Sequence, residues 1–182
     1  MMVEMIVLFS VRTVATLWFL RFMSNKLDIE IPKVSVVVFS LVLNLYTQEE
    51  RLILLGAVLF LTSEIDRREF RIPDFFTKPA LYTFTILAGL DWQHLAVAWG
   101  WIALMYGFTY LAPHALGRGD VKFIGALILL SKWMTDTPPQ LFLALLLALA
   151  SLLALPGSLL MRSRRRGYPF APAISGATLL LL

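Results

Sequence analysis

Two segments of the chain place aspartates beside apolar runs, where carboxyl groups are rare. In the first, residues 63–79, Asp66 follows one apolar run and the sequence Ile72-Pro73-Asp74 leads toward the next. In the second, residues 116–126, the sequence Gly117-Arg118-Gly119-Asp120 opens a further run. Ionisable side chains at the edge of a membrane span are costly, so these positions favour a functional role.

Paired aspartates on neighbouring helix ends predict acid–base hydrolysis. The two carboxyl groups can share a proton and hold a water molecule, as in aspartic proteases, one acting as base while the other polarises a carbonyl group. Asp120 would begin a helix, where the helix dipole favours the ionised form, and Asp66 would end one. We therefore expect Asp120 to be the ionised partner and Asp66 to hold the proton.

Each aspartate also has a simpler explanation that involves no catalysis. Asp120 follows Gly-x-Gly and precedes an apolar run, which is typical of a helix N-cap. Asp66 can be the polar residue that ends a membrane span. A capping role is compatible with a catalytic one, because the same carboxylate can do both.

The elements that must position these residues are apolar runs of nearly membrane-spanning length. A spanning helix needs about 20 apolar residues. The eight runs are 5–23, 34–46, 52–65, 79–90, 95–112, 121–134, 141–160 and 169–182. The runs at 34–46 and 52–65 are short, so they form either two tilted helices or a shallow hairpin. The pattern predicts an all-α polytopic membrane protein with about eight transmembrane helices.

The composition supports a lipid environment and excludes several classes of protein. Of the 182 residues, 59% are hydrophobic and 15% are charged, against about 25% charged in a soluble domain. Disorder is excluded, and an ordinary soluble globule fits poorly. The chain has no cysteine, which excludes disulfides, thiol catalysis and cysteine-bound zinc. Its histidines, His94 and His114, are isolated, so we expect no metal and no organic cofactor.

The basic residues predict the orientation of the chain. Alternate loops collect 13 of the 16 lysines and arginines, and the positive-inside rule places these loops in the cytoplasm, with both termini outside. They are Arg21, Lys26, Lys33, Arg67, Arg68, Arg71, Lys78, Arg118, Lys122, Arg162, Arg164, Arg165 and Arg166. Both aspartates then lie at the cytoplasmic boundary. The net charge of +4 is explained by topology, and we expect no nucleic-acid partner.

Three motifs in this order resemble those of a known family. Gly117-x-Gly119-Asp120-x-Lys122 resembles the GxGDxK signature of the GxGD-type intramembrane aspartic proteases, specifically the type IV prepilin peptidases. Asp66 lies six residues before Ile72-Pro73, like the first catalytic aspartate of that family. Pro169-Phe170-Ala171-Pro172 is similar to the family's Pro-Phe-Gly-Pro.

The resemblance implies an activity and a location. It implies a single transmembrane peptidase domain over 1–182, with extra N-terminal spans in 1–50 and a six-helix core in 51–182. This enzyme would remove the basic leader from type IV prepilins or pseudopilins, after a glycine, at the cytoplasmic face of the bacterial inner membrane. Asp66 and Asp120 would be catalytic. Membrane lipid and the pilin precursor would be its partners.

The other motif residues are candidates for binding the substrate. Gly117 and Gly119 either let the backbone approach a substrate strand or are plain loop glycines. Lys122 lies either near the carboxyl groups or at the lipid headgroups. Glu64, Glu69 and Asp74 are possible acidic partners for the basic leader. The remaining candidates are Ile72, Pro73, Pro169, Phe170 and Pro172.

The chain departs from the family pattern at three points. Asp74 stands where the family has Asn, which adds a negative charge near the site, and Ala171 stands where it has Gly, which restricts the backbone. Larger members also carry a zinc-binding cytoplasmic domain with paired CxxC motifs. This chain has no cysteine, so we expect peptidase activity without methylation of the mature pilin.

Three other functions remain alternatives. A signal-peptide-peptidase or presenilin-like enzyme shares GxGD, but pairs it with Tyr-Asp, whereas Asp66 follows Ile65. A small transporter or proton-coupled carrier would place its carboxyl groups nearer mid-membrane and show repeat symmetry. A non-catalytic assembly factor with the same fold is separated only by an activity measurement.

Overall fold

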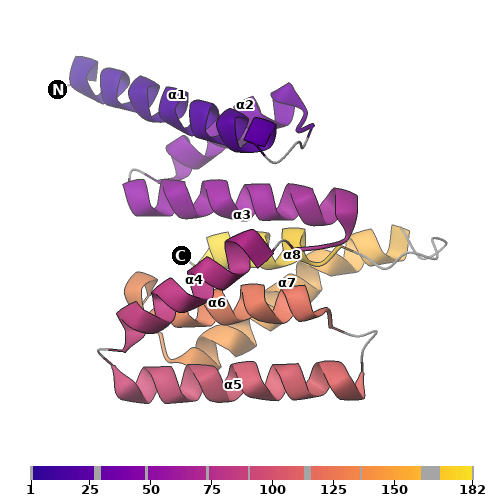
Figure 1. Cartoon of the computed structure of the whole chain (residues 1–182). Coiled ribbons are helices and arrows are strands. Elements are labelled where there is room, and N and C mark those ends of the chain that lie inside the picture. Colours follow the sequence, from indigo (N-terminus) through magenta and orange to yellow (C-terminus); the bar gives the residue numbers. More distant parts are fainter. Residues whose placement is uncertain are drawn as a thin grey trace. The chain divides into compact units, whose positions relative to one another are not determined.

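The regular structure of the chain is helical throughout the part that the computed structural model describes (Figure 1). That part comprises residues 2–26, 30–47, 49–72, 74–89, 91–112, 116–135, 137–160 and 169–181. It contains eight helices: α1 (Met2–Lys26), α2 (Lys33–Tyr46), α3 (Glu50–Glu69), α4 (Asp74–Ala88), α5 (Trp92–Leu111), α6 (Arg118–Met134), α7 (Pro139–Leu160) and α8 (Ala171–Leu181). Each overlaps one of the apolar runs, so the predicted all-α class is confirmed.

Two of these helices meet the requirements for crossing a membrane by length and composition. They are Ile6–Lys26 within α1 and Pro139–Pro156 within α7. Helices α2 and α8 are apolar but have 14 and 11 residues, below the roughly 20 that span a bilayer. The eight predicted transmembrane helices are therefore not confirmed as spans.

The chain divides into two compact units, Met1–Glu64 and Ile65–Leu182. Helix α3 crosses this division, and its last turns, which carry Asp66, belong to the second unit. The predicted organisation as one domain with a core from residue 51 stays a prediction.

The first unit is held together by apolar side chains of its helices. Leu20 of α1, Val36 of α2 and Leu61 of α3 belong to one buried cluster. The rings of Phe39 and Phe60 stack with centroids 4.3 Å apart. Helix α2 ends at Tyr46, and the next residue, Thr47, has an extended backbone and donates its N–H to the carbonyl of Leu43. The runs at 34–46 and 52–65 therefore form two separate helices.

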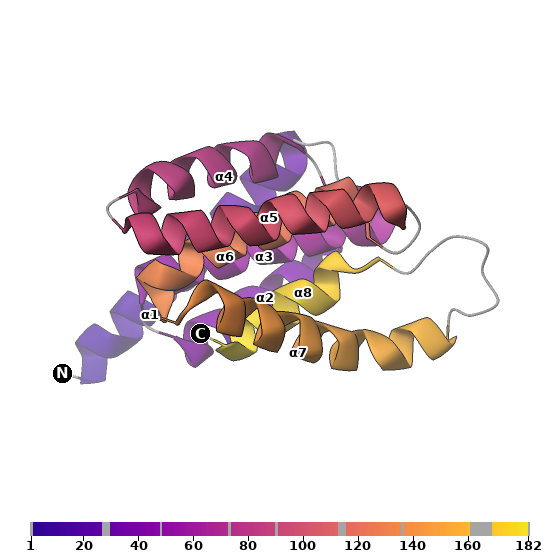
Figure 2. The same cartoon turned by 90° about the horizontal axis from the view of Figure 1, so that it is seen from below.

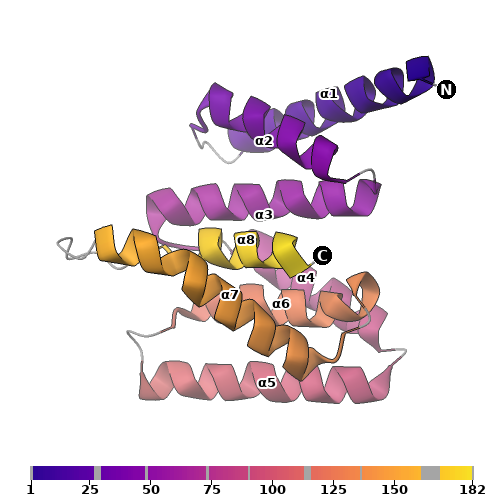
Figure 3. The same ribbon diagram turned by 180° about the vertical axis from the view of Figure 1, so that it is seen from behind.

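The second unit is built around α6. This helix packs against α4, α5, α7 and α8, and α7 packs along α8 (Figures 2 and 3). Val121, Ile124 and Ile128 of α6 are fully buried. Their spacing of three and four residues puts them on one helical face. Because α6 is central, its N-terminus is held on several sides, and that end carries the Gly-x-Gly-Asp motif.

Two helices of this unit begin clearly before their apolar runs. Helix α4 starts at Asp74 and α6 at Arg118, so charged residues of the connecting loops form the first turns. A carboxylate in a first turn is favoured by the helix dipole, which favours a start of α4 at Asp74. Because the helix starts there, Pro79 lies inside it. The C-terminal ends of α5 and α7 and the N-terminal ends of α6 and α8 lie at the same end of the unit (Figures 1 and 2).

Candidate active site

A cavity of about 550 Å³ lies in the second unit, and both aspartates line it. Its walls come from the last turn of α3, the residues that follow it, and the first turns of α4 and α6. The lining residues are Asp66, Glu69, Phe70, Arg71, Ile72, Asp74, Gly117, Arg118, Gly119, Asp120 and Lys122. Two of the three sequence motifs thus meet at one cavity.

The third motif, residues 169–172, contacts this site through a hydrogen bond to Asp66. The Asp66 side chain is only 5% exposed, and its Oδ2 accepts a hydrogen bond of 3.0 Å from the backbone N–H of Ala171. The N–H of Phe170 also donates to this carboxyl group. Ala171 is the first residue of α8. The first N–H groups of a helix have no partner inside it, so Asp66 satisfies donors that the helix leaves free.

Asp120 is tied to its own helix. It is the third residue of α6, and its Oδ2 accepts a hydrogen bond of 3.2 Å from the N–H of Gly117, which is the N-cap residue. The capping contact considered from the sequence is therefore present, but Asp120 makes it from the third helical position.

The two carboxyl groups influence each other electrostatically. Both lie just beyond the apolar runs 52–65 and 121–134. Burial raises the pKa of Asp120 to about 6, and the charge of Asp66 adds to this rise against the opposing hydrogen bond from Gly117. Burial also raises the pKa of Asp66, while the N–H groups of Ala171 and Phe170 oppose the rise. Each carboxyl group therefore holds its proton to a higher pH than an exposed aspartate would.

The two glycines of the motif lie against parts of the same chain. A Cβ atom at Gly117 would be 2.9 Å from Oδ2 of Asp120, and one at Gly119 would be 3.2 Å from Cβ of Ile72. The first distance is shorter than real contacts of this kind, and the second is tight. The glycines therefore make room for the Asp120 carboxyl group and for the packing of Ile72 on α6.

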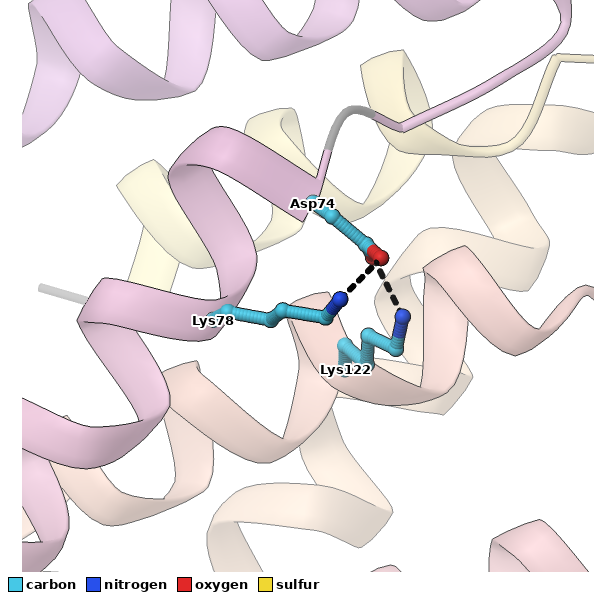
Figure 4. A network of polar contacts seen from close by, with 3 residues as sticks. All are labelled: Asp74, Lys78 and Lys122. Atoms are coloured by element: carbon cyan, nitrogen blue, oxygen red, sulfur yellow. Dashed lines mark hydrogen bonds and ion pairs between the residues drawn. The ribbon is translucent and has the colours of Figure 1, made fainter.

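A second polar cluster holds the start of α4 against α6 (Figure 4). Asp74 forms ion pairs with Lys122 of α6 and with Lys78, the latter at 2.7 Å. Hydrogen bonds from Lys122 and then from Lys78 lower the pKa of Asp74, and the pKa of Lys78 rises in return. The Asp that departs from the family's Asn is thus the direct partner of Lys122.

The other predicted residues are distributed around this site. Glu69 lines the cavity, whereas Glu64 is buried and is not among its lining residues. Pro169 is buried and Pro172 is half-buried. Pro73 lies outside the described residues.

Four residues of the site were not singled out as candidates from the sequence, and one of them is Arg118, which lines the cavity. Phe70 and Arg71 line the cavity, and Ala171 donates to Asp66. Phe70 has a φ of 54°, a left-handed conformation that is usually taken by glycine at a helix end. No sequence signal marks it, because phenylalanine is not expected there. Ala171 was noted only as a departure from the family pattern, and its backbone rather than its side chain makes the contact.

Comparison with protein families agrees with this arrangement. The model of the type IV leader peptidase family matches residues 53–158, more than half of the chain. The chain belongs to the type IV leader peptidase family. The resemblance found from the motifs is therefore confirmed, and the chain belongs to a family of membrane-associated proteases. The match includes Asp66 and Asp120 but ends before Pro169. No curated protein and no solved structure matches the chain.

Proposed function

We propose that the chain is a membrane-embedded aspartic endopeptidase that removes the basic leader from type IV prepilins or pseudopilins. Asp66 and Asp120 form its catalytic pair. One observation carries this proposal: two aspartates from separate motifs line the same cavity, and they are close enough for the charge of one to raise the pKa of the other. Family membership supports the class of substrate.

The pair can hydrolyse a peptide bond without any other group. The ionised carboxyl group takes a proton from a water molecule, whose oxygen then bonds to the scissile carbonyl carbon, while the protonated carboxyl group gives its proton to the carbonyl oxygen. The C–N bond of the resulting diol then breaks. The leaving nitrogen receives the proton taken from water, and the other carboxyl group recovers its proton from a hydroxyl of the diol.

The surroundings of the pair suit a basic leader. Glu69 is exposed and lines the cavity, so its carboxylate is available to a lysine or arginine of the substrate. Asp74 already binds two lysines, which makes it a structural anchor rather than a leader-binding residue. Glu69 is therefore the acidic residue that we assign to the leader.

The site lies at the cytoplasmic face in this proposal. The cavity is lined by Arg71, Arg118 and Lys122, which belong to the loops that carry 13 of the 16 basic residues. Such loops remain in the cytoplasm. The bacterial inner membrane is then the location, and the apolar stem of the substrate lies among the helices.

Co-expression with a candidate prepilin tests the proposal. Leader removal is followed by the change in gel mobility and by the N-terminal sequence of the product. Asp66→Asn and Asp120→Asn should each lower the cleavage rate by about 10²- to 10⁴-fold, because each removes an acid–base group. Full processing by either variant would contradict the catalytic pair.

Asp91→Asn is the matched control. Asp91 is outside the cavity and caps α5 through a hydrogen bond from the N–H of His94. Asparagine caps a helix about as well as aspartate. This variant should fold normally and cleave at the wild-type rate, so a loss of activity in it would show that the assay responds to any change of charge.

A further inference from the structure

The two aspartates have different hydrogen-bond environments, which bears on how they divide the work. Asp66 accepts N–H donors from Ala171 and Phe170 at the beginning of α8. Asp120 accepts one N–H donor, from Gly117, at 3.2 Å. Hydrogen bonds donated to a carboxylate favour its ionised form. Asp66 therefore receives the larger stabilisation of its negative charge.

The helix dipoles lead to the same result. Asp66 lies in the last turn of α3, where the dipole of that helix disfavours an anion, but its carboxyl group lies at the N-terminus of α8. The 11 residues of α8 carry no charged side chain, so no side-chain charge of this helix competes with its dipole at Asp66. The positive end of the α8 dipole opposes the negative end of α3 at the carboxyl group.

We infer that the first turn of α8 assigns the roles of the two aspartates, holding Asp66 as the ionised general base and leaving the shared proton on Asp120 as the general acid. This inference rests on the proposed catalytic pair and reverses the expectation from helix ends in the sequence. Ala171 is a positioning residue in it, since its N–H acts through Asp66. The pKa of Asp120, raised partly by the charge of Asp66, agrees with a proton on Asp120.

Other charged groups line the same cavity. They are Glu69 at the end of α3, Arg71 after it, Asp74 of α4, and Arg118 and Lys122 of α6. Asp74 is paired with Lys122 and Lys78, which reduces the effect of these three charges. None of these groups belongs to α8. Removing an N–H donor from α8 therefore changes the hydrogen bonds of Asp66 and leaves those of Asp120 in place.

Ala171→Pro removes the donor at a position that tolerates proline. Proline lacks an N–H and is favoured as the first residue of a helix, and the preceding Phe170 is not helical. Peptide cleavage is measured against pH with the purified protein. In Ala171→Pro the acidic limb of the profile should move up by about one pH unit, because the base loses a charge-assisted hydrogen bond. The basic limb should stay in place.

Two variants separate the loss of the donor from other changes. Ala171→Ser keeps the N–H and should keep the acidic limb at its wild-type pH. Ala171→Gly also keeps the N–H but removes a buried methyl group, so it reproduces a loss of packing without a loss of the donor. Movement of the basic limb in Ala171→Pro, or no movement in a folded variant, would overturn the assignment.

A measurement on the unmodified protein needs neither a substrate nor a folded proline variant. The carboxyl carbons of ¹³C-labelled aspartate are titrated by NMR in detergent micelles, with Asp66→Asn and Asp120→Asn used to assign the signals. The Asp66 signal should ionise at lower pH than that of Asp120. The reverse order would overturn the inference. Failure of the wild-type protein to cleave any prepilin would instead contradict the proposed function and leave this order of ionisation to be measured independently.

Discussion

Two aspartates with similar hydrogen bonds lie at opposite ends of α6, in opposite electrostatic settings: Asp120 belongs to α6, and Asp91 is the N-cap residue of α5. At the N-terminal end, Asp120 accepts the N–H of Gly117 and shares a cavity with Asp66. At the C-terminal end, Lys132 lies 3.4 Å from Asp91, which accepts the N–H of His94 at 3.0 Å. The His94 hydrogen bond and then Lys132 lower the pKa of Asp91, whereas burial and Asp66 raise that of Asp120.

This comparison shows that capping alone does not make a carboxyl group suitable for acid catalysis. Both aspartates satisfy backbone donors at the start of a helix, which is an ordinary structural role. Only the one that is half-buried beside a second carboxyl group has its pKa raised, to about 6. The neighbours of the carboxyl group, and not its position on the helix, separate the candidate catalytic end of the unit from its structural end.

Among changes that keep both carboxyl groups, the largest fall in cleavage rate is expected from Gly117→Ala. The added Cβ would lie 2.9 Å from the Asp120 carboxyl group and would force it to move. Misplacing a reacting group by about 1 Å can cost about 100-fold in rate, so cleavage should fall by about that factor. Gly100→Ala is the control, because a Cβ there has nothing within 4 Å. Equal rates in the two variants would show that the position of Asp120 is unimportant.

Asp120→Asn should stabilise the protein near neutral pH. Since the folded state raises the pKa of Asp120 from 3.8 to about 6, its contribution to stability is fully present below pH 4 and is lost as the pH rises through 6. Removing the charge should therefore add on the order of 2 kcal/mol at pH 7 and much less at pH 4. Thermal unfolding in detergent at the two pH values measures this. An unchanged Tm at pH 7 would contradict a destabilising charge on Asp120.

Asp91→Ala should destabilise the protein at pH 7, by less than Asp120→Asn stabilises it. The folded state lowers the pKa of Asp91, so its contribution is present above the unfolded value of about 3.9 and is lost as the pH falls through the lower folded value. Removing the cap should lower the Tm at pH 7, and the loss should shrink below pH 4. The same unfolding experiment tests it, and stabilisation by this variant would remove the contrast between the two ends.

The smallest change in stability is expected from a substitution of Phe70, which lines the cavity. Among the described residues other than glycine, only Phe70 has a positive φ. Such a backbone costs a non-glycine residue about 1 kcal/mol. Phe70→Gly removes this strain but also the contacts of the ring, which is 37% exposed, so the Tm should rise by a few degrees at most. A clear fall would mean that the ring contributes more than the strain costs.

Much of the fold was predictable from local patterns. Each described helix overlaps one apolar run, and α1 and α7 have the length and composition of spans. The helix ends were less predictable. Helices α4 and α6 begin in charged residues, which hydropathy alone assigns to loops. The two aspartates stood out because carboxyl groups are rare next to such runs.

The sequence by itself determined the helical class, the family and the candidate pair, because these follow from residue types and short spacings. The tertiary structure decided what surrounds the pair. Asp66 meets Ala171 across 105 positions of the chain, Lys122 meets Asp74 across 48, and Gly119 faces Ile72. No local pattern encodes such contacts, since they depend on how several helices pack around α6. For the same reason, helix ends in the sequence indicated Asp120 as the base, whereas the start of α8 favours Asp66.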